Sequence, residues 1–267
     1  MDILLTGTGT SHGMPVIGCT CPNCTSTDPK DNRLRTSCWI RGKDSTSIIV
    51  DTGPEFRIQA LKYNINSLDG VLITHSHADH VHGLDDLRVY SRKKTIPIYS
   101  NKNTITDLYN RFDYIFKDTQ EGGGKPHLAF ISCEQYTTKN ALKLGSLQIV
   151  PVPIKHGTLE VCGWKICEGN ASFAYITDCN YISKESIALI QKVDVLVIDG
   201  LRKRHHSTHF NFDEALEVTK QIMPQKAFFT HICHEHNHRE IIEYVSDKQK
   251  GLPFQIAPSY DGMTLHL

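Results

Sequence analysis

Imidazole and carboxylate side chains are concentrated in one short stretch, ITHSHADHVHG, which overlaps and follows the apolar run 70–74. Its four candidate ligands fall within six positions: His75, His77, Asp79 and His80. These donor types bind Zn, Mn or Fe, and the end of a rigid strand would fix their geometry. Four donors this close cannot all reach one ion with good angles and still leave room for a substrate. The pattern therefore predicts a pair of neighbouring ions, each completed by ligands from elsewhere, rather than a solvated polar loop.

The elements that must position such a site are short strands alternating with helices. Strand-length runs rich in Val, Ile and Phe cover residues 2–7, 46–53, 70–75, 96–100, 147–154, 172–178, 193–200 and 226–231. Helical patterns cover residues 55–64, 104–117, 184–192 and 212–223. This mixture indicates an α/β protein in which two sheet halves are covered by helices. Several strands end in residues that should gather at one rim of a sheet: Asp51, His75, Asp178, Asp199 and His231.

Charge and cysteine content narrow the class of protein. The 267 residues carry a formal charge of zero, so no overall field attracts nucleic acid or a membrane. The nine cysteines are an odd number in a chain too long to need disulfide staples, and the N-terminus has no signal-like pattern. No segment approaches the ~20 apolar residues of a membrane span. We therefore expect a cytoplasmic protein with reduced thiols, forming a single domain over residues 1–267, with a mobile surface loop at 119–127.

The stretch THSHADH resembles the signature of the metallo-β-lactamase superfamily, whose fold is a four-layer αββα sandwich of two mixed sheets flanked by helices. The similarity extends over nearly the whole chain, because later motifs follow in order: His156 in PVPIKHG, Asp178 in AYITDC and His231 in FFTH. The resemblance implies a dinuclear centre. One ion would be held by His75, His77 and His156, the other by Asp79, His80 and His231, and Asp178 would bridge them. Asp51 in VDTG matches a motif whose carboxylate orients a ligand rather than binding the metal.

A second metal site is predicted from three cysteines within six residues of the stretch CTCPNC: Cys19, Cys21 and Cys24. Thiolates favour a closed tetrahedral zinc site, which needs a fourth donor. The N-terminal loop leaves the first strand and His231 ends a late one, so both should open onto the same rim. The fourth donor predicted there is His234, with His236 a close rival and Cys233 a weaker one. Such a structural zinc would clamp the N-terminal loop to the rim and contribute folding free energy.

The run GTGTSHGMPVIGCTCPNC, followed by RLRTS, resembles one branch of the superfamily more closely. That branch contains the cyclic-phosphate phosphodiesterase of the carbon–phosphorus lyase pathway, and it pairs a dinuclear centre with a Cys3His zinc. The glycine-rich part lacks the Gly-Lys-Ser/Thr ending of a Walker loop and is expected to form a tight turn near the metals. His12 could contact substrate from this turn. Arg33 and Arg35 are open between a substrate contact and a salt bridge.

A proton donor is sought among the histidines that precede the helix at 212–223. Two metal ions with a bridging hydroxide suit attack on phosphorus or a carbonyl, and a phosphodiester also has a poor alkoxide leaving group that needs a general acid. The spacing from His209 to Glu214 resembles a histidine motif of the tRNA 3′-processing endonucleases. We assign His209 as the acid, with phosphate contact as a second role, and Asp79 as the group that orients the hydroxide. The basic stretch 201–206 would bind a terminal phosphate or stay solvated.

The expected function is hydrolysis of a small cyclic or linear phosphodiester by a dinuclear metal-dependent phosphodiesterase acting through a metal-bridging hydroxide. The active-site donors suit two Zn or Mn ions, with Fe or Ni also compatible, beside one structural Zn. Two alternatives are kept: a tRNA 3′-processing-type endonuclease, and a non-phosphodiesterase accessory protein of cofactor biosynthesis. The neutral charge argues against a stable nucleic-acid complex. Membrane association is not expected, and a homodimer is one state that the resemblance allows.

Overall fold

The computed structural model describes residues 1–118 and 124–267. Its strands are β1 (Asp2–Gly7), β2 (Ser37–Arg41), β3 (Ser47–Val50), β4 (Gly70–Leu72), β5 (Ile96–Ser100), β6 (Leu128–Ser132), β7 (Leu142–Leu144), β8 (Leu147–His156), β9 (Leu159–Glu168), β10 (Ala171–Ile176), β11 (Val195–Asp199), β12 (Lys226–Thr230), β13 (Gln255–Pro258) and β14 (Met263–His266). Its helices are α1 (Phe56–Lys62), α2 (Ala78–Val81), α3 (Lys102–Arg111), α4 (Lys184–Ile190), α5 (Phe212–Ile222) and α6 (His238–Lys248). Short 3-10 turns are η1 (Pro29–Asp31), η2 (Leu84–Val89) and η3 (Asp113–Ile115).

Within these ranges the strands form two mixed sheets of seven strands each. The first has the order β14-β1-β2-β3-β4-β5-β6 and the second β13-β12-β11-β10-β9-β8-β7. Strands β3 to β6 run parallel in the first sheet, as do β10 to β13 in the second, and the remaining neighbours are antiparallel. Neighbouring parallel strands end at the same edge of their sheet, so the residues that follow them are brought together.

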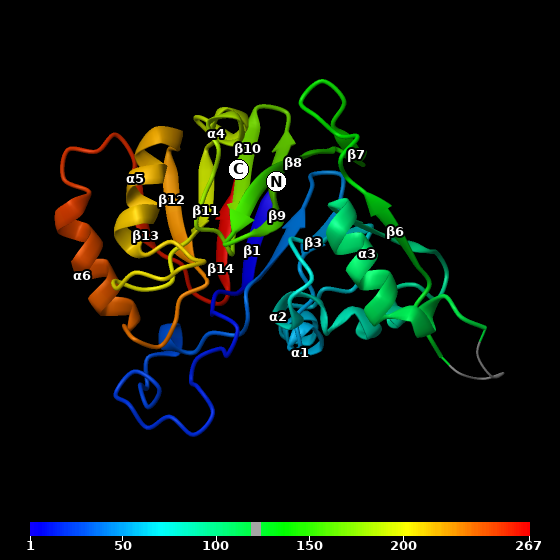
Figure 1. Ribbon diagram of the computed structural model, residues 1–267, viewed down its shortest axis with the longest axis horizontal. Coiled ribbons are helices and arrows are strands. Elements are labelled where there is room, and N and C mark those ends of the chain that lie inside the picture. The colour runs from blue at the N-terminus through cyan, green and yellow to red at the C-terminus, as the bar shows by residue number, and fades with distance from the viewer. Residues whose placement is uncertain (119–123) are drawn as a thin grey trace.

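Three apolar layers hold the sheets and helices together. Between the sheets lies a core that includes Ile3, Leu5, Trp164 and Tyr175, all fully buried. A second core packs the outer face of the first sheet against α1 and α3, and a third packs the second sheet against α4, α5 and α6. Figure 1 shows the result, with α1 to α3 on one side of the two sheets and α4 to α6 on the other. The αββα sandwich expected from the sequence is confirmed.

The predicted elements are all present, although their bounds differ. The pattern over 104–117 was expected to form one helix, but α3 ends at Arg111 and a separate turn, η3, begins at Asp113. The cause is local, because Phe112 leaves the helical region with a ψ of 36° and interrupts the run. Elements that the sequence patterns did not predict are β2, β6, β7, β9, β13, β14, α2 and α6.

The loop expected at 119–127 lies partly outside the described residues, which resume at Gly124. In the part of the chain that the structure describes, no helix combines the length and the apolar character needed to cross a bilayer. The expected single domain over residues 1–267 stays a prediction.

Candidate metal centre and its surroundings

The candidate centre lies at the edge where the parallel strands of both sheets end. His75 follows β4, Asp178 follows β10 and His231 follows β12. Two of these residues, Asp178 and His231, have left-handed backbones with φ of 53° and 58°, as does Asp51 after β3 with φ of 61°. A positive φ is uncommon for residues other than glycine and clusters at functional sites. Strands β3, β10 and β12 therefore each end in a sharp turn that carries a polar side chain at the rim.

One side of the centre is formed by three histidines whose ring nitrogens converge: His75, His77 and His156. The Nε2 atom of His75 lies 2.8 Å from Nδ1 of His77. His156 donates from Nδ1 to the carbonyl oxygen of Thr208, 2.7 Å away, which leaves the lone pair of Nε2 free to bind a metal. His75 is fully buried and His77 is exposed, so this side of the centre opens to solvent at His77.

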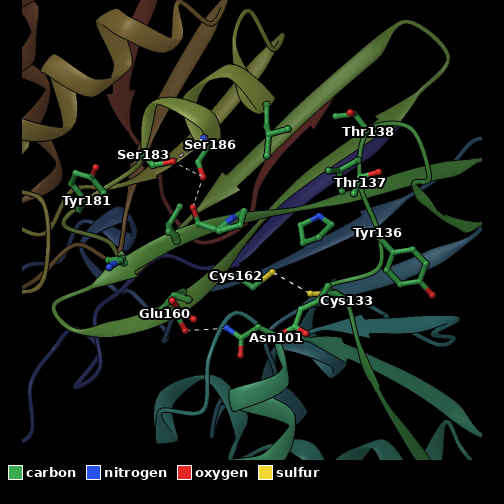
Figure 2. Close-up of a pocket in the computed structure, with 18 residues that line it drawn as sticks. Asn101, Cys133, Tyr136, Thr137, Thr138, Glu160, Cys162, Tyr181, Ser183 and Ser186 are labelled. Atoms are coloured by element: carbon green, nitrogen blue, oxygen red, sulfur yellow. Dashed lines mark hydrogen bonds between the residues drawn. The ribbon is translucent and has the colours of Figure 1, made fainter.

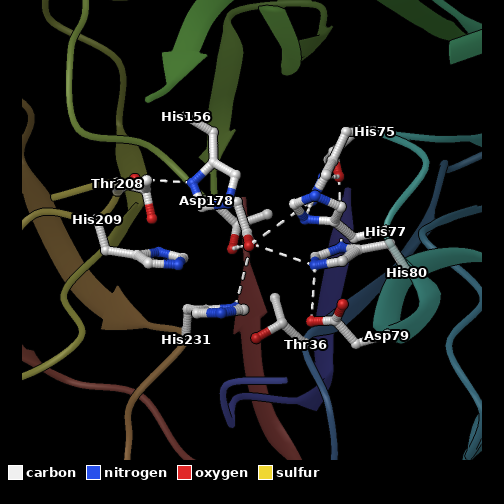
Figure 3. Close-up of polar contacts among 12 residues, drawn as sticks. Thr36, His75, His77, Asp79, His80, His156, Asp178, Thr208, His209 and His231 are labelled. Carbon is white, nitrogen blue, oxygen red and sulfur yellow. Dashed lines mark hydrogen bonds and ion pairs between the residues drawn. The ribbon is translucent and has the colours of Figure 1, made fainter. Parts of the chain in front are cut away.

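The other side gathers four buried groups: Asp79, His80, Asp178 and His231. Oδ2 of Asp178 lies 3.3 Å from Nε2 of His80 and 3.1 Å from Nδ1 of His231. Oδ2 of Asp79 lies 3.2 Å from Nε2 of His80. Asp178 also belongs to a cluster with His156, so its carboxylate lies between the two sides, as Figure 3 shows. This placement agrees with the bridging position that the superfamily resemblance implies.

The donor set suits a pair of divalent cations. Nε2 of His80 and Nδ1 of His231 are buried yet have no hydrogen-bond partner within the described residues, an arrangement that costs free energy unless a cation is bound there. Burial opposes protonation of His80, but Asp178, Asp79 and Asp51 outweigh this and raise its pKa well above the ordinary value. The carboxylates therefore attract positive charge to this point, whether as a proton or as a metal ion.

Asp51 contacts the centre through His80, in the position that the superfamily resemblance implies. Its Oδ2 accepts a hydrogen bond from Nδ1 of His80 at 2.7 Å, and its Oδ1 accepts from the backbone N–H of Thr74 at 2.8 Å. The first contact fixes the His80 ring with its Nε2 lone pair toward the centre. The following turn must be tight, because a Cβ on Gly53 would lie 2.2 Å from the carbonyl oxygen of Asp79. Glycine in VDTG thus lets this loop pack against α2.

His209 borders the centre and is held by a second carboxylate. Its Nδ1 lies 2.7 Å from Oδ2 of Asp199, and its ring stacks on that of His231 with 4.8 Å between centroids. The ring of His156 is 4.5 Å away on another side. Burial opposes protonation of His209, but Asp199 outweighs it and raises the pKa of His209 to about 9. Sequence reasoning found His209 and noted Asp199 only as a strand-ending acid, so the pairing of the two was missed.

A separate cluster joins the N-terminal loop to the segment after β12. Backbone hydrogen bonds from Thr10 N to Ile232 O (3.2 Å) and from Ile232 N to Thr8 O (3.0 Å) align the two segments. The sulfur atoms of the cysteines lie 3.4–3.6 Å from Nδ1 of His234, in the group Cys19, Cys21, Cys24 and His234. The backbone N–H of Cys24 and the side chain of His234 lower the pKa of Cys21 to about 6. Three sulfurs and one ring nitrogen form a donor set suited to a closed structural zinc.

The rivals for the fourth position lie elsewhere. His236 points its Nδ1 at Oε2 of Glu240, 3.6 Å away, and Cys233 is buried outside the cysteine cluster. His12 is exposed and lies edge-on to the ring of His234 rather than in the dinuclear centre, with 5.5 Å between the ring centroids.

The two arginines of the RLRTS stretch have structural partners. Arg33 is almost fully buried and donates from Nη1 to the hydroxyl of Thr8 at 2.8 Å and to the carbonyl oxygen of Ser259 at 2.6 Å. Arg35 forms a salt bridge with Glu55. Neither guanidinium belongs to the donor clusters of the centre.

A cleft lined by other residues lies away from the histidines of the candidate centre. It has a volume of about 570 Å³ and is lined mostly by residues of β8, β9 and α4 and by the chain after β6. Figure 2 shows two thiols in it, Cys133 and Cys162, whose sulfur atoms are 3.7 Å apart. Both cysteines are buried, and burial raises the pKa of Cys162 well above its ordinary value, so we assign this pair to packing.

Comparison with known proteins agrees with this geometry. Residues 46–232 match the family model of the beta-lactamase superfamily domain. The chain is 35% identical over 265 residues to an octanoyltransferase of Porphyromonas gingivalis, covering 98% of this chain and 51% of that protein. It is 25% identical over 164 residues to the exodeoxyribonuclease YycJ of Bacillus anthracis, covering 60% of this chain and 56% of that protein. The chain thus spans about half the length of these curated relatives.

Among solved structures, the fold is similar to that of a new diphosphatase from the PhnP family. The TM-score is 0.84 at 32% sequence identity, and the match covers 100% of this chain and 97% of the other. The family match, this structural similarity and the rim of histidines and carboxylates all lead to the same assignment. The chain belongs to the metallo-β-lactamase superfamily.

Proposed function

We propose that the chain is a phosphodiesterase that hydrolyses a small cyclic or linear phosphodiester. The observation that carries this proposal is the position of His209. A buried imidazole, held by Asp199 at 2.7 Å, stands beside a cluster of histidine and carboxylate ligands. Hydrolysis of a diester expels an alkoxide, and a proton donor next to the reacting phosphorus meets that requirement. The similarity to a diphosphatase supports a phosphorus centre as the electrophile.

Each residue of the site has a defined part in this proposal. His75, His77 and His156 would hold one divalent ion and Asp79, His80 and His231 the other, with Asp178 between them. When bound, the two ions would supply an activated water and stabilise negative charge on the phosphoryl oxygens. Asp79 orients the attacking group, since its carboxylate lies in the cluster and can accept a hydrogen bond. His209 donates a proton to the departing oxygen from Nε2, because Nδ1 is engaged by Asp199.

Several features favour a small substrate over a polynucleotide. The formal charge of the chain is zero, whereas proteins that bind nucleic acids usually have a basic surface. Arg33 and Arg35 are engaged by other protein groups rather than left to bind phosphate. The exodeoxyribonuclease and octanoyltransferase names of the curated relatives nevertheless define substrates that a test must include.

The test is a substrate panel run on the purified chain with and without metal. The protein is stripped with a chelator and reloaded with Zn²⁺ or Mn²⁺, and metal content is measured beside activity. The panel contains cyclic and linear phosphodiesters, a diphosphate, an acyl thioester, a β-lactam, single-stranded DNA and tRNA. We expect metal-dependent turnover of the small phosphodiesters well above that of the other classes. Preferential cleavage of the thioester, the lactam or either nucleic acid would reject the proposal.

A further inference from the structure

His206 stands beside the proposed acid and has no role in the mechanism above. Its ring centroid is 5.1 Å from that of His209, and the residue is half-buried. His205, its neighbour in the chain, instead points to the surface and pairs with Glu214 at 3.1 Å. The two adjacent histidines therefore face different surroundings, and only one of them lies next to the reacting groups.

The hydrogen bonds of His206 determine which of its nitrogens carries the proton. The backbone N–H of Thr208 points at Nδ1 of His206, 3.3 Å away. A backbone N–H can only donate, so Nδ1 accepts and the proton of the neutral ring must lie on Nε2. Burial and the positive charges of His209 and Arg202 lower the pKa of His206, which favours this neutral form. Within the described residues no partner is recorded for Nε2, so a hydrogen-bond donor remains available beside His209.

The charges around this donor identify the kind of group that it would meet. The preceding turn carries three cations, Arg202, Lys203 and Arg204, and the nearby carboxylates are Glu235 and the Glu214 that pairs with His205. Arg202 lies 2.8 Å and Arg204 2.6 Å from the same oxygen of Glu235, so one negative charge serves both guanidinium groups. Lys203 lies over the ring of Tyr244, 4.8 Å from its centroid. The turn therefore keeps a net positive charge next to His206.

We propose that His206 binds an anionic oxygen on the leaving-group side of the substrate by donating a hydrogen bond from Nε2. The position of His209 identifies this as the leaving-group side of the substrate, because the acid that protonates the departing oxygen must lie next to the leaving group. The substrate class that follows is a phosphodiester whose leaving group itself carries a phosphate or a carboxylate. This inference rests on the proposed function and adds a substrate preference to it.

The experiment compares two aryl diesters whose leaving phenols differ by a single ring carboxylate. Replacing His206 by alanine should lower kcat/KM for the carboxylated diester roughly tenfold to hundredfold, the range expected for a lost hydrogen bond to a charged group. The neutral diester should lose less than about threefold. His206→Gln, which keeps an N–H donor, should recover part of the loss, and His205→Ala is the matched control that should change neither substrate. Metal content and melting temperature are measured for every variant.

The outcomes separate this inference from the function on which it rests. Equal losses on both diesters, or a loss that tracks metal content, would assign His206 a structural role and overturn the inference alone. Unchanged kcat/KM in His206→Ala on both diesters would also overturn the inference, because it would show that the side chain contributes to neither substrate. If the metal-loaded wild type cleaves neither diester, then both the inference and the proposed function fail.

Discussion

Replacing His209 by alanine should slow hydrolysis more severely the poorer the leaving group. His209 is only 8% exposed, and its ring is hydrogen-bonded to Asp199 at 2.7 Å and packed against His156 and His231. These contacts fix the donor in place, and Asp199 keeps it protonated near neutral pH because it raises the pKa of His209 to about 9. The substitution removes this proton donor while leaving the proposed metal ligands unchanged.

The size of the effect follows from what the acid contributes. General acid catalysis typically accelerates a reaction by about 10²–10⁴-fold, which corresponds to about 3–5 kcal/mol of transition-state stabilisation. A diester with an alkyl leaving group needs this assistance in full. A p-nitrophenyl diester needs little of it, because p-nitrophenolate is stable without a proton. We therefore expect losses of about 10²–10⁴-fold on the alkyl diester and less than about tenfold on the nitrophenyl diester.

The assay measures kcat on both diesters for the wild type, His209→Ala and Asp199→Asn. Asp199→Asn keeps the shape of the pair but removes the charge that stabilises the imidazolium, so it should show a smaller loss with the same dependence on leaving group. His205→Ala serves as the matched histidine control, since that side chain is exposed and contacts Glu214. Elemental analysis of each variant checks that the metals remain bound.

If His209→Ala lowered kcat equally on the two diesters, the acid assignment would be refuted, because the contribution of a proton donor depends on how poor the leaving group is. A loss of active-site metal in the same variant would also refute it. His209 forms a cluster with His156 and Asp178, so such a result would make it a ligand instead.

Three further predictions concern metal content and stability. Cys24→Ser should release one zinc per chain and lower the melting temperature. The control is Cys167→Ser, which lies outside the ligand clusters and should keep the zinc. Equal zinc content in the two variants would contradict the Cys3His site. Asp178→Asn should lose most active-site metal while circular dichroism stays unchanged, because asparagine also tolerates a left-handed backbone. Burial and the charge of Arg33 lower the pKa of His238 to about 4 in the folded protein. Between pH 6.5 and 4 the unfolded chain therefore binds more protons than the folded one. The free energy of unfolding should fall by up to about 3 kcal/mol as the pH is lowered through this range. Urea unfolding at several pH values should show this slope, and His238→Gln should flatten it.

Local patterns predicted the α/β class and the first group of histidines, and the resemblance to the superfamily supplied the αββα sandwich and the remaining residues of the main cluster. H-x-H-x-D-H follows a strand, and the later ligands also stand at strand ends, where topology brings them to one edge. The hydrogen-bonded pair of Asp199 and His209 could not be predicted in the same way. The two residues are ten positions apart along an irregular segment, and no period relates them. Only the folded path of the chain after β11 brings the imidazole back over the end of that strand.

Strand β9 and helix α6 were not predicted from the sequence because other features obscured their patterns. Strand β9 reads LEVCGWKICE, in which a glycine and charged residues interrupt the alternation that marks a strand. Helix α6 begins at a capping box formed by Asn237 and Glu240, a signal that was present but lay within a histidine-rich stretch assigned to metal binding. The choice of His234 over His236 also depended on tertiary structure. Both lie within reach of the rim in sequence, and their orientation is set by the turn before α6.

The left-handed residues at the strand ends have a consequence for the engineering of this protein. Asp51, Asp178 and His231 each hold a backbone conformation that costs an L-residue roughly 1–2 kcal/mol and costs glycine almost nothing. A directed-evolution campaign that screened only for heat resistance would recover this backbone cost by placing glycine at Asp178 or His231, whereas glycine at Asp51 would lose the buried hydrogen bonds to Thr74 and His80. Thermotolerant clones obtained in that way should be catalytically silent, so a useful screen must score turnover in every round.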